Sequence, residues 1–371
     1  MKIAFDAKRA FMNYSGLGNY SRTLIHSAST YYPDNEYFLY TPSKENNFKD
    51  FPPKDAKIVF PESLFNKKFS SYWRTYKIAD SLKDQKIDLY HGLSHELPQN
   101  IEKSGSKSIV TIHDLIYYRY PELYNIIDRK IYHKKLKHAV RVADKIIAIS
   151  NQTKRDIISF LNVEESKIEV MYQSSNPLYN IQLENEQLFL IKKKYNLPSE
   201  FILSVGTIEK RKNLLKLLQA VQHSKSKIPV VVVGKEKDYA SEVHNFISEN
   251  NIANILFLKN VSNAELSGIY QLATLFIYPS SFEGFGLPVL ESLQSGTPVI
   301  AAKGSCLEEA GGKHSVYIDP FNIEEFAHAI NLVLDNSKLR NEMKIKGFEF
   351  SKKFETKTII KSLFKIYESI I

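Results

Sequence analysis

Residues 274–302, TLFIYPSSFEGFGLPVLESLQSGTPVIAA, carry two short apolar runs on either side of one helix signal. Thr274–Tyr278 and Pro298–Ala302 have the length and composition of buried strands. Between them, Pro288 suits the first turn of a helix, and Gly296 followed by Pro298 ends it. The stretch therefore predicts a strand, a loop, a short helix and a second strand, which is the repeating unit of a parallel α/β sheet.

The loop Ser280–Leu287 has the composition of a ligand site. It follows the carboxyl end of a strand and leads into a helix, where open parallel sheets bind ligands. Gly284 and Gly286 allow close approach of the backbone, and the free N–H groups near 285–287 favour a phosphate. Glu283 and Glu291 accept hydrogen bonds from hydroxyls instead. The combination predicts a nucleotide sugar, with a solvated surface loop as the alternative.

Three motifs resemble one known family. S-x-F-E-G-F-G-L-P-V-L-E at 280–291, with seven residues between the glutamates, resembles the signature of retaining GT-B glycosyltransferases of family four (glycosyl transferases group 1). G-T-I-E-x-R-K-N at 206–213 resembles the family's diphosphate-binding turn. His113-Asp114-Leu115, followed by Tyr120-Pro121-Glu122, is similar to its active-site histidine motif. The resemblance implies a GT-B fold of the α/β class, with two doubly wound Rossmann-like domains facing across a cleft.

The same resemblance assigns roles to individual residues. It implies that Glu283 holds the sugar and steadies positive charge on its ring, and that His113 contacts the sugar from the first domain. Glu291 would bind the ribose. The residues that it implies for donor binding are Gly16, Gly18, Arg211, Lys212, Val261, Phe285, Gly286, Leu287 and Glu291. Arg211 and Lys212 suit a pyrophosphate as a planar fork and a point charge.

The length of 371 residues favours two domains. We expect an acceptor-binding domain over 1–178, a nucleotide-sugar-binding domain over 179–354 and a last helix, 355–371, that packs back on the first. A hydrophobic content of 43% and a charged content of 25% are ordinary for a globular protein. No apolar run reaches the length of a membrane span, and the one cysteine, Cys306, fits a packed residue in a reducing cytoplasm.

Strand signals recur along both halves. The expected strands are Lys2–Asp6, Glu36–Thr41, Lys57–Phe60, Asp88–His91, Ser108–Ile112, Lys145–Ile149, Ile168–Met171, Phe201–Val205, Val230–Val233, Ile255–Leu258, Thr274–Tyr278 and Pro298–Ala302. A helix over 71–85 carries Trp73, Tyr76, Ala79 and Leu82 at helical spacing, which predicts that all four pack in the core.

The charge balance favours anionic partners. Lys and Arg number 50 against 41 Asp and Glu, an excess that could also reflect genome composition. Residues 117–145 are basic and aromatic, which is typical either of a solvated helix face or of a surface that docks on anionic lipid and presents a lipid-linked acceptor. No nucleic-acid-binding module accompanies the charge. A peripheral position at the inner face of the cytoplasmic membrane is therefore one expectation.

Several alternatives remain at this point. The absence of D-x-D leaves no evident carboxylate pair for a metal, so we expect no metal and no other cofactor. The glycines at 16 and 18 follow their strand too late for a dinucleotide oxidoreductase. A GT-B nucleotide-sugar epimerase or hydrolase and a non-catalytic binding module are the other candidates. The motif variants most resemble mannosyltransferases of surface polysaccharide synthesis, which makes GDP-mannose the expected donor for a hexosyltransferase acting on a glycan or lipid-linked glycan.

Overall fold

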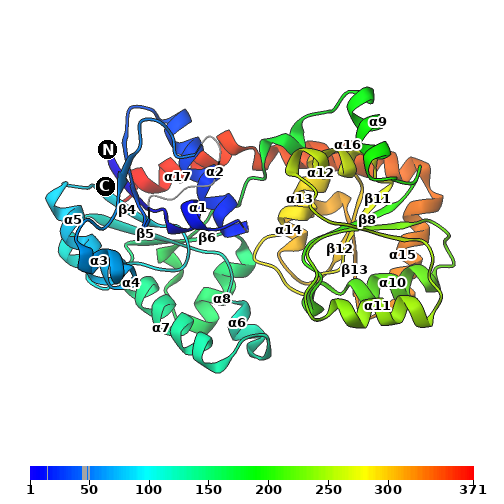
Figure 1. Cartoon of the computed structure of the whole chain (residues 1–371), viewed down its shortest axis with the longest axis horizontal. Helices are drawn as coiled ribbons and strands as arrows, with labels where there is room; N and C mark the ends of the chain where they lie inside the picture. Colours follow the sequence, from blue (N-terminus) through cyan, green and yellow to red (C-terminus); the bar gives the residue numbers. More distant parts are fainter. Residues whose placement is uncertain (15, 44–47, 49–50) are drawn as a thin grey trace. The chain divides into compact units, whose positions relative to one another are not determined.

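The computed structural model describes residues 1–371 except 15, 44–47 and 49–50. Contacts between residues divide the chain into two compact units, which we describe separately (Figure 1). Unit 1 comprises Met1–Gln173 and Thr356–Ile371, and unit 2 comprises Ser174–Glu355.

In the described part of unit 1, seven parallel strands form one sheet in the order β3-β2-β1-β4-β5-β6-β7. Alternate residues of β1 enter two different hydrophobic clusters, Ile3 and Phe5 in one and Ala4 in the other. The sheet is therefore covered on both faces, as parallel sheets are. Its strands are β1 (Lys2–Asp6), β2 (Glu36–Tyr40), β3 (Lys57–Val59), β4 (Leu89–Gly92), β5 (Lys107–Ile112), β6 (Lys145–Ala148) and β7 (Ile168–Val170).

The helices of unit 1 include one from the far end of the chain. Helix α17 lies beside α2 (Figure 1), and the rings of Tyr32 and Phe364 stack with centroids 3.6 Å apart. The helices are α1 (Lys8–Met12), α2 (Gly16–Tyr31), α3 (Leu64–Lys68), α4 (Ser70–Tyr72), the π-helical turn η1 (Trp73–Lys77), α5 (Ile78–Asp84), α6 (Ile116–Arg119), α7 (Ile126–Val142), α8 (Asn151–Leu161) and α17 (Thr356–Glu368).

The described residues of unit 2 form a six-stranded sheet in the order β10-β9-β8-β11-β12-β13, again with all strands parallel. Its strands are β8 (Ile202–Val205), β9 (Val230–Val233), β10 (Ile255–Leu258), β11 (Leu275–Tyr278), β12 (Val299–Ala302) and β13 (Val316–Ile318). Its helices are α9 (Asn185–Lys194), α10 (Leu214–His223), α11 (Ala240–Glu249), α12 (Asn263–Leu272), α13 (Leu287–Gln294), α14 (Leu307–Gly311), α15 (Ile323–Asp335) and α16 (Ser337–Ser351).

All the expected strands are present, and the α/β class with two parallel sheets is confirmed. One packing prediction is wrong: Trp73 is buried, but Tyr76 is 47% exposed. The cause is the π-helical turn Trp73–Lys77, in which residues three apart no longer share a face.

Each sheet has one point at which the strand order reverses direction. In unit 1 this switch lies between the neighbours β1 and β4, and in unit 2 it lies between β8 and β11. Loops that leave the carboxyl ends of two such strands diverge and leave a crevice, which is where doubly wound sheets bind ligands. In unit 2 these loops are 206–213 and 279–286, the two motif-bearing stretches of that half.

Candidate functional site

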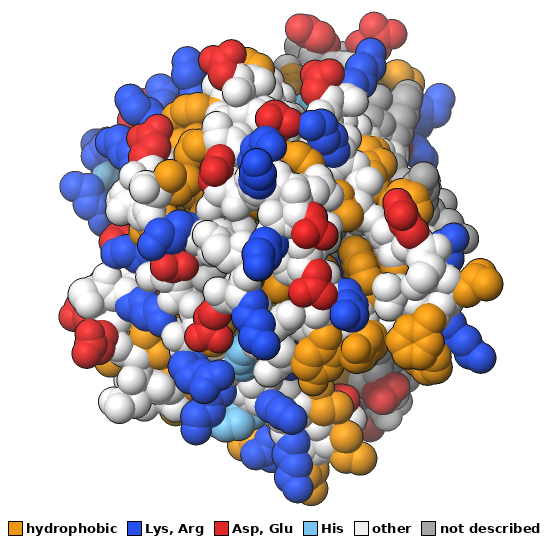
Figure 2. Space-filling model, turned by 90° about the vertical axis from the view of Figure 1, so that its left-hand side faces the viewer, with side chains coloured by type: hydrophobic (Ala, Val, Ile, Leu, Met, Phe, Trp, Pro, Cys, Tyr) orange, Lys and Arg blue, Asp and Glu red, His pale blue; other side chains and the backbone are white. Residues whose placement is uncertain are grey.

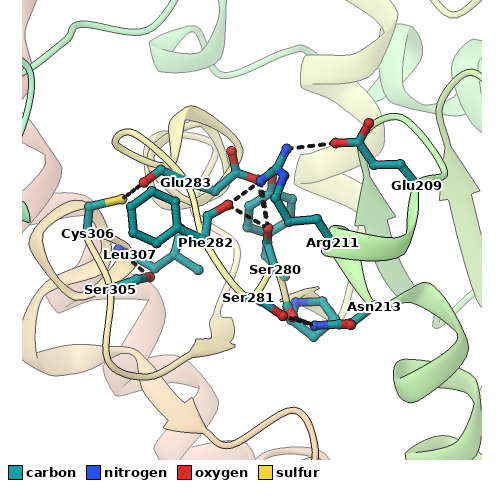
Figure 3. Close-up of polar contacts among 12 residues, drawn as sticks. Glu209, Arg211, Asn213, Ser280, Ser281, Phe282, Glu283, Ser305, Cys306 and Leu307 are labelled. Atoms are coloured by element: carbon teal, nitrogen blue, oxygen red, sulfur yellow. Dashed lines mark hydrogen bonds and ion pairs between the residues drawn. The ribbon is translucent and has the colours of Figure 1, made fainter. Parts of the chain in front are cut away.

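The two loops at the switch point of unit 2 are tied together by their own hydrogen bonds. The backbone N–H of Ser281 donates to the carbonyl of Arg211 at 2.9 Å. The side-chain amide of Asn213 donates to the carbonyl of Pro279 at 2.9 Å and to the hydroxyl of Ser281 at 2.6 Å (Figure 3). These bonds hold the cations of the first loop against the glutamate of the second.

Glu283 is the centre of the resulting cluster. Its Oε1 accepts hydrogen bonds from the hydroxyls of Tyr278 at 2.7 Å and Ser280 at 2.8 Å. Nη1 of Arg211 lies 2.7 Å from the same oxygen, and the two side chains point toward each other in Figure 3. Burial alone would raise the pKa of Glu283, but the charges of Arg211 and Lys212 hold it below its ordinary value. The carboxylate is therefore ionised at neutral pH.

The guanidinium of Arg211 is fully engaged within this cluster. Besides Glu283 it contacts the carbonyl of Phe282, and its Nη2 donates to Oε1 of Glu209 at 2.7 Å (Figure 3). Glu209 is shared with Lys237, whose Nζ lies 2.7 Å from the other carboxylate oxygen. The guanidinium of Arg211, which the sequence predicts to bind a diphosphate, is thus hydrogen-bonded to protein groups in this structure.

Lys212 differs from Arg211 in that its side chain has no hydrogen bond or ion pair with any residue that the structure describes. Its ammonium lies 5.5 Å from the ring centre of Tyr278. A Cβ on Gly206 would come within 2.5 Å of that ammonium, so the glycine makes room for it. The charge of Lys212 lowers the pKa of both Glu283 and Glu291, which places it within electrostatic reach of each.

Glu291 lies in α13 and has a different environment from Glu283. The hydroxyl of Tyr270, from α12, donates to its Oε2 at 3.2 Å. Burial raises the pKa of Glu291 to about 7, although the hydrogen bond from Tyr270 and the charge of Lys212 act in the opposite direction. One motif glutamate is therefore held ionised, while the other titrates near neutral pH.

The start of α13 is shaped by Gly286. This residue has φ +115°, and a Cβ there would lie 2.7 Å from a methyl group of Leu307, so only glycine fits without strain. Pro288, which has no N–H, follows in the first turn, and the N–H of Val289 donates to the carbonyl of Gly286 at 3.0 Å. The N–H of Leu287, the first residue of the helix, has no acceptor within the helix. Phe285 is buried and its ring packs on Phe354 with centroids 5.4 Å apart. Any ligand contact of Phe285 must therefore come from its backbone, as with Gly286 and Leu287.

The remaining predicted residue of unit 2 lies further along the sheet. Val261 follows β10, which is the outer strand next to β9, and it is half-buried beside the Ser262 cap of α12. It shares the carboxyl edge of the sheet with the cluster, because β10 is parallel to β8 and β11. No hydrogen bond or ion pair of the described residues joins Val261 to the two glutamates.

His113 lies in unit 1, directly after β5. Its Nε2 is 2.8 Å from the carbonyl of Leu93 and its Nδ1 is 3.1 Å from the side-chain amide of Gln173. These partners assign the proton to Nε2. Burial, and then the nearby His95, lower the pKa of His113 to about 3. The ring is therefore neutral, with both nitrogens occupied.

The two predicted glycines of unit 1 differ from each other. Gly16 opens α2 with open space where a Cβ would be. A Cβ on Gly18 would fall 1.8 Å from the carbonyl oxygen of Asn13, so close packing within the loop explains this glycine by itself. Neither observation tests an approach to a ligand.

Sequence reasoning missed the residues that tune the cluster. Tyr278 and Ser280 lie inside the quoted stretch, where the sequence predicts only a strand and a loop, and Tyr270 belongs to a helix with no motif. Cys306 was expected to be packed, and it is buried, with its Sγ 3.0 Å from the carbonyl oxygen of Glu283. The signal for Tyr278 was present, since a tyrosine at the carboxyl end of a buried strand places its hydroxyl at the loop.

The described residues contain neither a metal-binding cluster of side chains nor a helix that could span a membrane. No group of three or more His, Cys, Asp or Glu side chains there could hold a metal ion. None of the helices in that part of the chain is both long and apolar enough to cross a bilayer. Independence from metals and other cofactors stays a prediction.

Comparisons with known proteins match both halves of the chain. Residues 16–174 match the model "Glycosyltransferase Family 4", and residues 188–350 match "Glycosyl transferases group 1". The O-antigen chain mannosyltransferase B of Escherichia coli is 26% identical over 376 residues, covering 95% of this chain and 96% of that protein.

Solved structures share the fold. A glycosyltransferase from Rickettsia africae superposes with a TM-score of 0.78 at 19% identity, covering 100% of this chain and 98% of the other. HepE of Anabaena in complex with UDP-glucose superposes with a TM-score of 0.76 at 17% identity, with 100% of both chains covered.

Proposed function

The chain belongs to the GT-B glycosyltransferases of family 4 and group 1, and we propose that it transfers a mannosyl residue from GDP-mannose to a hydroxyl of a glycan or lipid-linked glycan. The name of the E. coli relative supports mannose as the sugar and O-antigen or a related surface polysaccharide as the product. The UDP-glucose in the Anabaena structure supports a nucleotide sugar as the class of donor.

The observation that carries the proposal is the unpaired side chain of Lys212, whose charge acts on two glutamates. The pKa of Glu283 lies below its ordinary value, and the pKa of Glu291 lies above it. The ammonium of Lys212 is available for the diphosphate, together with the N–H of Leu287 at the start of α13. The ribose hydroxyls bind Glu291, and the hydroxyls of the sugar bind Glu283. Val261 contacts the base.

Arg211 joins the diphosphate by exchanging partners. Its bonds to Glu283 and Glu209 are replaced, at least in part, by phosphate oxygens, which suit its planar fork. This exchange frees Oε1 of Glu283 for the sugar. Binding of the donor diphosphate therefore also releases the carboxylate of Glu283 from Arg211.

The transfer itself proceeds with retention of the anomeric configuration. The acceptor hydroxyl attacks the anomeric carbon from the face that the nucleotide leaves. As the new C–O bond forms and the bond to the diphosphate breaks, the departing phosphate oxygen takes the hydroxyl proton. Glu283 stabilises positive charge on the sugar ring, Lys212 and Arg211 stabilise the leaving diphosphate without a metal, and neutral His113 contacts the sugar.

The donor is tested by thermal shift with GDP, UDP and dTDP, followed by their sugars. We expect the largest stabilisation with GDP and then transfer from GDP-mannose, with the product anomer read by NMR. An inverted product would contradict the mechanism. Donor consumption at the same rate without any acceptor would point to hydrolysis or epimerisation instead.

We also propose that unit 1 docks on an anionic membrane surface. Large apolar side chains are exposed on α7 and the loop before it and on the segment α3 to η1: Leu64, Phe65, Phe69, Tyr72, Tyr76, Leu123, Ile126, Ile127, Ile131 and Tyr132. Lys67, Lys68, Lys130 and Lys134 lie among them. Figure 2 shows such a mixture of apolar and basic side chains on the lower part of the face that carries α3 to α5. This composition is typical of interfacial binding.

Co-sedimentation with liposomes tests the docking. We expect binding to vesicles that contain phosphatidylglycerol and little binding to phosphatidylcholine alone. Ile127→Ser with Ile131→Ser should reduce the bound fraction. Equal binding to both kinds of vesicle would contradict the role of the lysines.

A further inference from the structure

Two cations with unpaired side chains lie at the carboxyl end of the sheet in the described part of unit 1. Lys8 and Arg9 lie in α1, directly after β1. Neither side chain has a hydrogen bond or an ion pair with any residue in the described part of the chain. Both are only half-exposed, so water does not fully screen their charges.

The acids nearby are already paired with other cations. Asp6 accepts from Nη2 of Arg74 at 2.7 Å. Glu96 lies 3.1 Å from the same guanidinium and 3.1 Å from Nζ of Lys135. Burial, and then the charge of Arg74, lower the pKa of Lys8, while the charges of Glu96 and Asp6 act in the opposite direction. An anion that approached Lys8 and Arg9 would therefore meet carboxylates that Arg74 and Lys135 already neutralise.

His95 lies at the same edge, after β4, the strand that pairs with β1 at the switch point. Its backbone has φ +63°, a strained conformation for a residue other than glycine, and its N–H donates to the carbonyl of Thr111 at 3.0 Å. Its ring lies 5.4 Å from that of His113. Its imidazole has no hydrogen bond to any described residue. The fold thus places an imidazole without a hydrogen-bond partner among the described residues within electrostatic reach of Glu96 and Arg9.

Resting on the glycosyl transfer proposed above, we propose that the crevice at the ends of β1 and β4 binds an anionic group of the acceptor, with Arg9 and Lys8 as its counter-charges and His95 on a neighbouring hydroxyl. A neutral glycan would leave both half-buried cations unpaired, whereas a phosphate or carboxylate matches the fork of Arg9. Two acceptors supply such a group: a saccharide on a phosphorylated lipid carrier and a saccharide with an acidic sugar.

Titration calorimetry of the full chain with small anions tests this site without donor or turnover. The probes are n-butyl phosphate, butyrate and n-butanol, used in a Lys212→Gln background so that the cation site of unit 2 does not contribute. We expect n-butyl phosphate to bind and n-butanol to give no heat. Arg9→Gln should weaken phosphate binding about tenfold to a hundredfold, the range of a charged hydrogen bond. Lys8→Gln serves as a second variant if Arg9→Gln does not fold.

Arg129→Gln is the matched control, since it removes one arginine charge from α7. If Arg9→Gln and Arg129→Gln bind n-butyl phosphate equally well, or if n-butyl phosphate does not bind the parent chain, the proposal is wrong. Stronger binding of n-butyl phosphate than of butyrate indicates a phosphorylated carrier, and equal binding indicates an acidic sugar. Failure of GDP-mannose as donor would leave these results unchanged.

Discussion

Lys212→Met tests the proposed diphosphate site most directly. The substitution keeps the length of the side chain beside Gly206 and Tyr278 and removes only the charge. Because the side chain of Lys212 has no hydrogen bond or ion pair with any described residue, the change breaks no such bond in the free protein. The folded chain should therefore be as stable as the wild type, and the loss should be confined to ligand binding.

The size of that loss follows from the contact that is removed. A hydrogen bond between charged partners contributes about 1.5–3 kcal/mol, which corresponds to about a 10- to 150-fold rise in Kd. Removal of the positive charge should also raise the pKa of Glu291 further above its ordinary value, since Lys212 lowers it in the wild type.

Calorimetric titration with GDP measures the affinity, and Lys237→Met is the control. Lys237 pairs with Glu209 at 2.7 Å but is 62% exposed, so its removal should change the Kd by less than about threefold. If Lys212→Met bound GDP within that same threefold range, the diphosphate would not contact Lys212, and the assignment of the site would fail.

Three further predictions concern the same loops. Glu283→Gln should abolish transfer, while the Kd for GDP stays the same or falls, because Arg211 is released from its carboxylate partner; retained turnover would contradict the role of Glu283. Because burial raises the pKa of Glu291 from 4.5 to about 7, the protonated form is favoured in the folded chain and its stabilisation is lost as pH rises through 7. Glu291→Gln should therefore melt at about the wild-type temperature at pH 5 but above it at pH 8, and a constant difference between the two proteins would refute this. Gly286→Ala forces alanine to φ +115° and a methyl group toward Leu307, which should cost about 1–3 kcal/mol and lower the melting temperature; an unchanged value would show that the loop relaxes freely.

The sequence was sufficient for the strands because parallel strands buried on both faces are continuous apolar runs, as Val230–Val233 is. It was less informative for Val316–Ile318, which is only half-buried apart from Ile318 and is not among the expected strands. The face of Tyr76 was predicted wrongly, since a π-helical turn leaves no trace in hydrophobic spacing.

Within the site, local sequence indicated which residues carry the chemistry but not how they pair. Arg211 and Glu283 are 72 positions apart in the chain, and they meet only because β8 and β11 are neighbours in the sheet. The pKa values of the two glutamates also depend on partners from separate elements, such as Tyr270 in α12. Strand order and burial determine which side chains pair and how their pKa values shift, and the spacing of residues within a motif does not predict either.

The reactivity of the Cys306 thiol can report on opening of the loop that carries Glu283. This is the one cysteine of the sequence, and its sulfur is sealed beneath the carbonyl of Glu283. Because the side chain is buried, a thiol reagent can reach it only when the structure around it opens, including the loop that carries Glu283. The rate of alkylation therefore measures how often the loop opens, and any compound that clamps the loop will slow the labelling, with no engineered probe required.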